Sequence, residues 1–125
     1  MARSPFSPAT DRAVRLAALS ALPCEAVGFI WRPPGQAEAV IPLLNTSEAP
    51  ENSYAIEVEA AARAFTDFTG SDIVDVAEGD LLLWHSHPSG YVGPSQGDLQ
   101  AKLPGLRYMV VVLSHTSEDI TYVEF

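Results

Sequence analysis

The sequence contains a single cysteine, Cys24, so the chain cannot form an internal disulfide and its fold must depend on a hydrophobic core. It also lacks any apolar run near the roughly 18 residues that a membrane-spanning helix needs. The first residues have no apolar segment of the kind that forms a secretory signal. We therefore expect a cytoplasmic protein with no membrane partner.

Basic residues are scarce, because 7 Lys and Arg stand against 16 Asp and Glu, which gives a formal net charge of −9. This is the wrong sign for a surface that neutralises phosphates, so we expect no nucleic-acid partner. Most of the acidic excess lies in the segment 46–80, where Arg63 is the only basic residue. A solvated helix face explains this segment best, and the alternative is a docking surface for a basic partner.

The 125 residues are 47% hydrophobic and 18% charged, which suits one globular domain and is too short for two. Residues 1–9 carry two prolines and no periodic pattern. They are predicted to form a flexible N-terminal arm, followed by one domain over residues 10–125.

Hydrophobic periodicity predicts an α/β (α+β) fold that mixes helices with short strands. Thr10 or Asp11 is expected to cap the first helix, and Gly70 to end the second. The first two strands flank a turn at residues 32–35 and are expected to pair in antiparallel fashion. The predicted helices cover residues 11–22, 57–68 and 95–103, and the predicted strands cover residues 25–31, 38–44, 80–84, 107–113 and 120–125.

The most informative segment is His85-Ser86-His87, followed by Ser95 and then by Asp98. In an extended chain, side chains two residues apart leave from the same face, so the two histidines can converge on one ion. Two imidazole nitrogens and one carboxylate oxygen suit zinc, and a fourth position left for water is typical of a catalytic site. The pattern therefore predicts a metal site with His85, His87 and Asp98 as ligands.

Each part of this pattern also has a structural interpretation. Ser95 and Asp98 lie three residues apart at a predicted helix start, where they resemble a capping box. A lone His-x-His is more often held by hydrogen bonds than by a metal. The glycine- and proline-containing loop between the two parts favours the metal interpretation, because it can bring Asp98 back toward the histidines.

A hydrolytic zinc site also needs a base, and Glu25 is the candidate. Strand alternation places Glu25 on one face with the apolar Val27, Phe29 and Trp31. Burial on that face is expected to raise its pKa toward neutrality, which suits a general base. The alternative is a glutamate at a sheet edge whose carboxylate lies in water. Of the remaining candidates, His115 is expected to lie on the surface and Cys24 to be a buried small hydrophobe.

Together these residues resemble the JAMM (MPN-plus) metallopeptidases, whose pattern is a glutamate upstream of His-[Ser/Thr]-His-x7-Ser-x2-Asp. The resemblance extends from Cys24 to Phe125. It implies a single mixed sheet with flanking helices, similar to the cytidine deaminases, and one zinc ion per chain. It also implies Glu25 as the general acid and base, Ser95 as a donor that stabilises the oxyanion, and a peptide or isopeptide bond of a protein as the substrate.

Within that family the chain resembles the short bacterial and phage members, through residues 24–29 and 45–56. Such members trim the C-terminal tail of ubiquitin-like sulfur carriers or act as the peptidase domain of phage tail-assembly proteins. We expect the first type, since the sequence ends at Phe125. RadC-like proteins share the segment 85–90 and are a weaker alternative. A non-catalytic, zinc-containing module that binds partners is the alternative outside enzymes.

Overall fold

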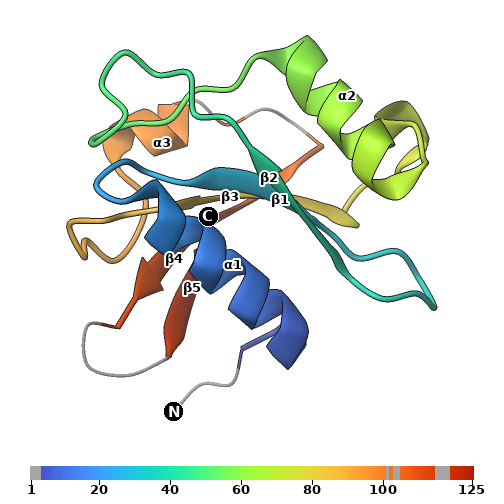
Figure 1. Cartoon of the computed structure of the whole chain (residues 1–125), viewed down its shortest axis with the longest axis horizontal. Helices are drawn as coiled ribbons and strands as arrows, with labels where there is room; N and C mark the ends of the chain where they lie inside the picture. The colour runs from blue at the N-terminus through green and yellow to red at the C-terminus, as the bar shows by residue number, and fades with distance from the viewer. Residues whose placement is uncertain (1–3, 101, 103–104, 115–118) are drawn as a thin grey trace.

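The five strands formed by the described residues make one mixed sheet, which confirms the predicted α+β class. The computed structural model describes residues 4–100, 102, 105–114 and 119–125, and within these ranges three helices flank the sheet (Figure 1). None of the helices within these ranges combines the length and the apolar character that crossing a membrane requires. The elements are α1 (Pro8–Ala21), β1 (Val27–Trp31), β2 (Ala39–Leu43), α2 (Val58–Thr69), the short 3-10 helix η1 (Ile73–Asp75), β3 (Leu81–Ser86), α3 (Gln96–Gln100), β4 (Arg107–Leu113) and β5 (Ile120–Glu124).

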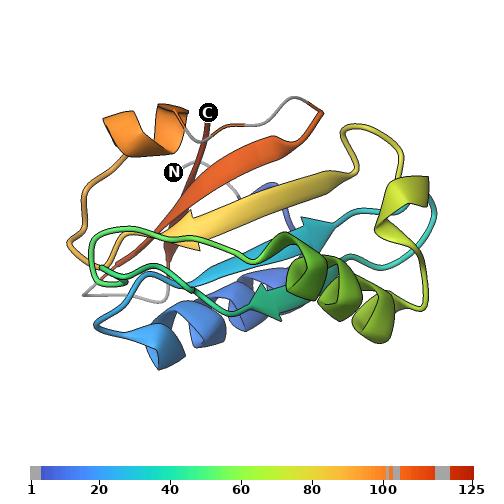
Figure 2. The same cartoon turned by 90° about the horizontal axis from the view of Figure 1, so that it is seen from above.

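The strand order is β2-β1-β3-β4-β5, so β3 lies at the centre (Figure 2). Strands β3 and β4 are parallel, whereas the other neighbours are antiparallel, including the predicted pair of β1 and β2. Helix α2 lies within one residue of its predicted bounds and ends at Gly70, whose φ of 75° is left-handed. The end of the predicted helix 95–103 and His115 in the last turn lie outside the described residues.

The core has two halves, one on each face of the sheet, with α1 on one face and α2 on the other (Figure 1). Strand β3 contributes to both, since Leu82 and Trp84 pack toward α1 while Leu81 and Leu83 pack toward α2. The same alternation assigns His85, at the end of the strand, to the α2 face. The two apolar layers therefore fix which face carries the candidate site.

The start of α1 differs from the prediction. The helix begins at Pro8 rather than at residue 11, and its cap is Ser7, whose Oγ accepts a hydrogen bond from the Thr10 N–H at 3.2 Å. Proline at a first helical position loses no hydrogen bond, so Pro8 starts the helix instead of preventing it. Phe6 is only 7% exposed and packs edge-on against Tyr122 at 4.9 Å. The predicted arm is thus wrong for residues 6–9, which are part of the folded domain.

Gly28 provides a first testable prediction, because the backbone of β2 and an indole ring approach it closely. A Cβ atom at Gly28 would lie 2.7 Å from the Ile41 carbonyl oxygen and 3.0 Å from Trp84 Nε1. Gly28→Ala is therefore expected to lower the free energy of unfolding by about 1–3 kcal/mol, measured by urea denaturation. Gly97→Ala is the control, since its nearest contact would be an ordinary 3.8 Å. Equal losses in the two variants would contradict the steric explanation.

Candidate metal centre

The candidate site lies at the end of the sheet where β3 finishes and β1 begins. Val27 of β1 pairs with His85 of β3, and the Ser86 N–H donates to the Ala26 carbonyl oxygen at 2.9 Å. Pairing thus continues past the first residue of β1 toward Glu25. Because side chains alternate along both chains, Glu25, His85 and His87 share the α2 face. The expectation that both histidines leave from one face is confirmed.

Three potential ligand atoms converge at this point, all from buried residues. The Nε2 atoms of His85 and His87 are 3.1 Å apart, and Asp98 Oδ2 lies 3.0 Å from the first and 3.1 Å from the second. Ligand atoms of Glu25 and the two histidines also lie within 4.8 Å of one another. The structure therefore brings the three predicted ligands together with the predicted base, and Glu25, His85 and His87 form a group that could hold a metal ion.

Hydrogen bonds alone do not account for the convergence of these three atoms. An ionised Asp98 oxygen only accepts, and each Nε2 presents either one hydrogen or one lone pair. If both nitrogens carry hydrogen, the two N–H groups oppose each other across 3.1 Å. If only one of the two nitrogens carries hydrogen, or neither does, at least one of the three contacts places two lone pairs against each other. A cation bound by all three atoms removes this conflict.

The hydrogen bond made by the other ring nitrogen of His87 also favours a bound cation. Its Nδ1 lies 3.0 Å from the Tyr91 carbonyl oxygen, which can only accept, so Nδ1 carries the hydrogen. A neutral His87 ring then presents its Nε2 lone pair to the centre. Histidine ligands of metals are commonly fixed in this way, by a carbonyl oxygen that binds the other ring nitrogen.

The protonation states also suit metal binding. Burial, opposed in part by the nearby Asp98, lowers the pKa of His85 to about 4, so its ring is neutral at physiological pH. Burial alone would raise the pKa of Asp98, but hydrogen bonds from Ser95 and the proximity of His85 lower it instead. A neutral imidazole and an ionised carboxylate are the forms that bind metal ions.

The distances fit a small divalent cation. Zinc holds nitrogen and oxygen ligands at about 2.0–2.1 Å in tetrahedral geometry, which separates neighbouring ligand atoms by about 3.3 Å. The observed separations of 3.0–3.1 Å are close to this value. The Ser95 N–H supports Asp98 by donating to the same oxygen at 2.8 Å. The residues present therefore fit a zinc-type ion.

Comparison with known proteins does not extend this argument, because no family model and no curated protein matches the chain. What the site does must be argued from its own residues.

Ser95 forms the capping interaction that its spacing suggests. Its Oγ accepts the Asp98 N–H at 3.0 Å, while its own N–H donates to the Asp98 carboxylate, so the two residues close the first turn of α3 reciprocally. The structural alternative for this motif is thus confirmed. It coexists with the position of Asp98 at the histidines, since one carboxylate oxygen serves both.

Glu25 is buried, with 5% of its surface exposed, and its Oε1 has no hydrogen-bond partner among the described residues. Burial, and secondarily the charge of Asp98, raises the pKa of Glu25 to about 7. The expected shift toward neutrality is confirmed. The alternative of a carboxylate in water at a sheet edge is wrong, because the chain after β2 covers this end of the sheet.

Two residues near the centre were not predicted to act there. The Tyr54 ring stacks on the His85 ring, with centroids 4.4 Å apart and planes 27° from parallel. Asn45 bonds the carbonyl oxygen of Glu25. Local sequence signals only that Asn45 starts a turn, in which the Ser47 N–H donates to its Oδ1. The resemblance of residues 45–56 to the short family members includes Asn45 and Tyr54 but assigned neither a role at the centre.

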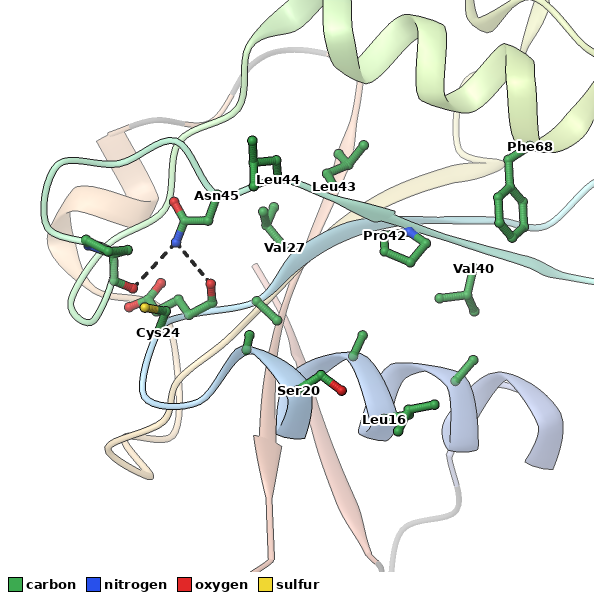
Figure 3. A pocket seen from close by; sticks show the side chains of 16 residues that line it. Leu16, Ser20, Cys24, Val27, Val40, Pro42, Leu43, Leu44, Asn45 and Phe68 are labelled. Atoms are coloured by element: carbon green, nitrogen blue, oxygen red, sulfur yellow. Dashed lines mark hydrogen bonds between the residues drawn. The ribbon is translucent and has the colours of Figure 1, made fainter.

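A groove of about 740 Å³ lies between α1 and β2 (Figure 3), and of the four residues of the centre only Glu25 is among those that line it. Its apolar walls include Leu16 and Phe68, and one end reaches Glu25. Cys24 lines the groove and is only partly buried, which corrects the expectation of a buried hydrophobe. The groove thus approaches the centre from the side of Glu25.

Proposed function

We propose that this protein is a zinc-dependent peptidase or isopeptidase of the JAMM type. The observation that carries the proposal is the convergence of His85, His87 and Asp98 beside a buried Glu25 whose Oε1 has no hydrogen-bond partner in the described part of the chain. A purely structural metal site does not require an unpaired carboxylate beside it, whereas a hydrolytic metal site requires a general base at that position. The spacing of these residues, which resembles the JAMM pattern, supports the same assignment.

In this proposal His85, His87 and Asp98 hold the zinc ion, which supplies a Lewis acid that activates water and polarises a carbonyl group. Glu25 accepts a proton from the attacking water at its carboxylate and later donates it to the leaving amine. A pKa of about 7 suits both transfers at physiological pH.

The Ser95 hydroxyl is proposed to stabilise the developing oxyanion. Its Oγ accepts the Asp98 N–H, which leaves the hydroxyl hydrogen free to donate elsewhere. The side chain is also exposed, so a substrate can reach it. The capping and the catalytic roles of Ser95 are therefore compatible.

We further propose that the substrate is the C-terminal tail of a ubiquitin-like, sulfur-carrier type of protein. This finer assignment is supported by the resemblance of residues 24–29 and 45–56 to the short members of the family. The groove that Glu25 lines also offers an extended tail a path to the proposed base.

The proposal is tested with a sulfur-carrier protein that carries a few extra residues after its terminal glycines. Intact-mass spectrometry is expected to show release of the extra residues by the zinc-loaded protein. Removing the metal with a chelator is expected to slow the release by at least about 100-fold, and added zinc to restore it. The matched control is a carrier whose tail ends at the glycines. An extended carrier left intact by the zinc-loaded protein would contradict the proposed substrate, and peptide mixtures left intact would contradict the proposed activity.

A further inference from the structure

The position of Glu25 is set by its main chain rather than by its side chain. It lies two residues before β1, and its own backbone groups bond the loop after β2 rather than a neighbouring strand. Its carboxylate oxygen Oε1 makes no hydrogen bond among the described residues. The position of the carboxylate therefore depends on the contacts that hold the Glu25 backbone.

The backbone of Glu25 is held by the loop of residues 45–55. The Glu25 N–H donates to the Pro50 carbonyl oxygen at 2.7 Å, and the Asn45 side-chain amide donates to the Glu25 carbonyl oxygen at 3.0 Å. Figure 3 shows the Asn45 amide between the main chains of the two segments. The loop thus binds Glu25 through both of its backbone polar groups.

Asn45 also closes the loop on itself. Its Nδ2 donates to the Ser53 carbonyl oxygen at 3.0 Å, and its Oδ1 accepts the N–H groups of Ser47 at 3.0 Å and Ala55 at 3.1 Å. One side chain therefore uses both donors and both acceptor positions of its amide. Among the described residues, Asn45 is the only one whose side chain bonds the Glu25 backbone. The position of the Glu25 backbone therefore depends on Asn45, both directly and through the loop that Asn45 closes.

The same loop reaches a second residue of the centre, because Tyr54 stacks on the His85 ring. The loop that Asn45 closes thus contacts both the proposed base and one proposed ligand. By contrast, His87 donates to the Tyr91 carbonyl oxygen and Asp98 accepts the Ser95 N–H, so these two residues are supported by the segment 91–95.

We infer that Asn45 is a positioning residue that holds the Glu25 carboxylate against the metal centre. The inference deepens the proposed function, on which the catalytic role of Glu25 rests. Asn45→Asp is the sharpest variant, because it keeps the shape and the two acceptor bonds but replaces the amide donor by a carboxylate oxygen. That oxygen would face the carbonyl oxygens of Glu25 and Ser53 and repel them.

The first measurement uses metal-free protein and hydrogen exchange of single amides by NMR. In Asn45→Asp we expect the Glu25 N–H to exchange about tenfold faster, while the Ile30 N–H in the middle of β1 keeps its protection. Asn52→Asp, the same change at an exposed position of the same loop, is the control and is expected to leave both amides unchanged. An unchanged Glu25 N–H in Asn45→Asp would overturn the inference.

The second measurement uses the visible absorption of the protein loaded with Co²⁺, which reports the surroundings of the ion. Glu25→Gln and Asn45→Asp are expected to change the spectrum in the same way, and the double variant to show no further change. Fully additive changes would mean that Asn45 acts on the centre independently of Glu25, which would overturn the inference.

The two measurements separate this inference from the proposed function. A wild-type protein that binds no Co²⁺ and no Zn²⁺ would contradict the metal centre. Hydrogen exchange in the metal-free protein would still decide whether Asn45 holds Glu25.

Discussion

His87→Ala is expected to lower the zinc content of the purified protein from about one ion per chain to nearly none. The variant removes one of three atoms that lie 3.0–3.1 Å apart, and it also removes the hydrogen bond that ties the ring to the Tyr91 carbonyl oxygen. Two ligand atoms are fewer than the three or four that protein zinc sites supply, so we expect the ion to be lost during gel filtration. Elemental mass spectrometry of the eluted protein measures the loss directly.

His115→Ala is the matched control for this experiment, since it removes the one histidine that the sequence predicts to lie outside the centre. We expect it to retain its zinc. The melting temperature with and without zinc is a second measurement. We expect zinc to raise it in the wild type and in His115→Ala, but not in His87→Ala. Saturation at 1,000 times the dissociation constant stabilises a folded protein by about 4 kcal/mol. Equal zinc content in all three proteins would exclude the proposed centre.

Glu25→Gln is expected to retain zinc and to lose about 10²–10⁴-fold in turnover. Glutamine preserves the shape of the side chain in its buried position, but its amide neither accepts a proton from water nor returns one to a leaving amine. Zinc content and the release of tail residues are measured on the same preparation. Glu48→Gln, an identical change at an exposed position of the loop after β2, is expected to alter neither.

The result also decides between two sets of ligands. In one set the two histidines bind the ion together with Glu25, whose ligand atom lies within 4.8 Å of theirs. In the other set they bind it together with Asp98, whose Oδ2 lies 3.0 and 3.1 Å from their Nε2 atoms. Loss of zinc in Glu25→Gln would make Glu25 a ligand and leave the reaction without a base. Unchanged turnover with zinc retained would remove Glu25 from the reaction. Absence of turnover in the zinc-loaded wild type would favour a binding module instead.

Much of the centre could be predicted because it depends on local geometry. Alternation along a strand places His85 and His87 on one face wherever the strand lies, and the three-residue spacing of Ser95 and Asp98 predicts a helix start in almost any fold. The apolar pattern of the following strand placed Glu25 on the buried face, but it left open the alternative of a carboxylate in water at a sheet edge.

The remainder depends on tertiary contacts that leave no local pattern. The reach of Asn45 to Glu25 spans 20 residues and is fixed by the path of the chain after β2. The contact of Phe6 with Tyr122 joins the two ends of the chain, so the first residues look unstructured when only their neighbours are considered. Pro8 led to the wrong prediction that residues 6–9 belong to an arm, because proline is common both at the first position of a helix and where a helix is interrupted.

The order of the site residues along the chain has a consequence for folding. The two histidines and Asp98 are 11 and 13 residues apart, whereas Ala26 and Ser86, the neighbours of Glu25 and His85, are 60 residues apart. A newly made chain can therefore capture a metal ion with one short segment before the sheet has formed. The proposed base, Glu25, reaches the centre only when β1 pairs with β3. We therefore expect a metal-loaded but incompletely folded chain to have no hydrolytic activity. Metal captured by the unfolded chain also reduces the stability that the ion adds to the native state.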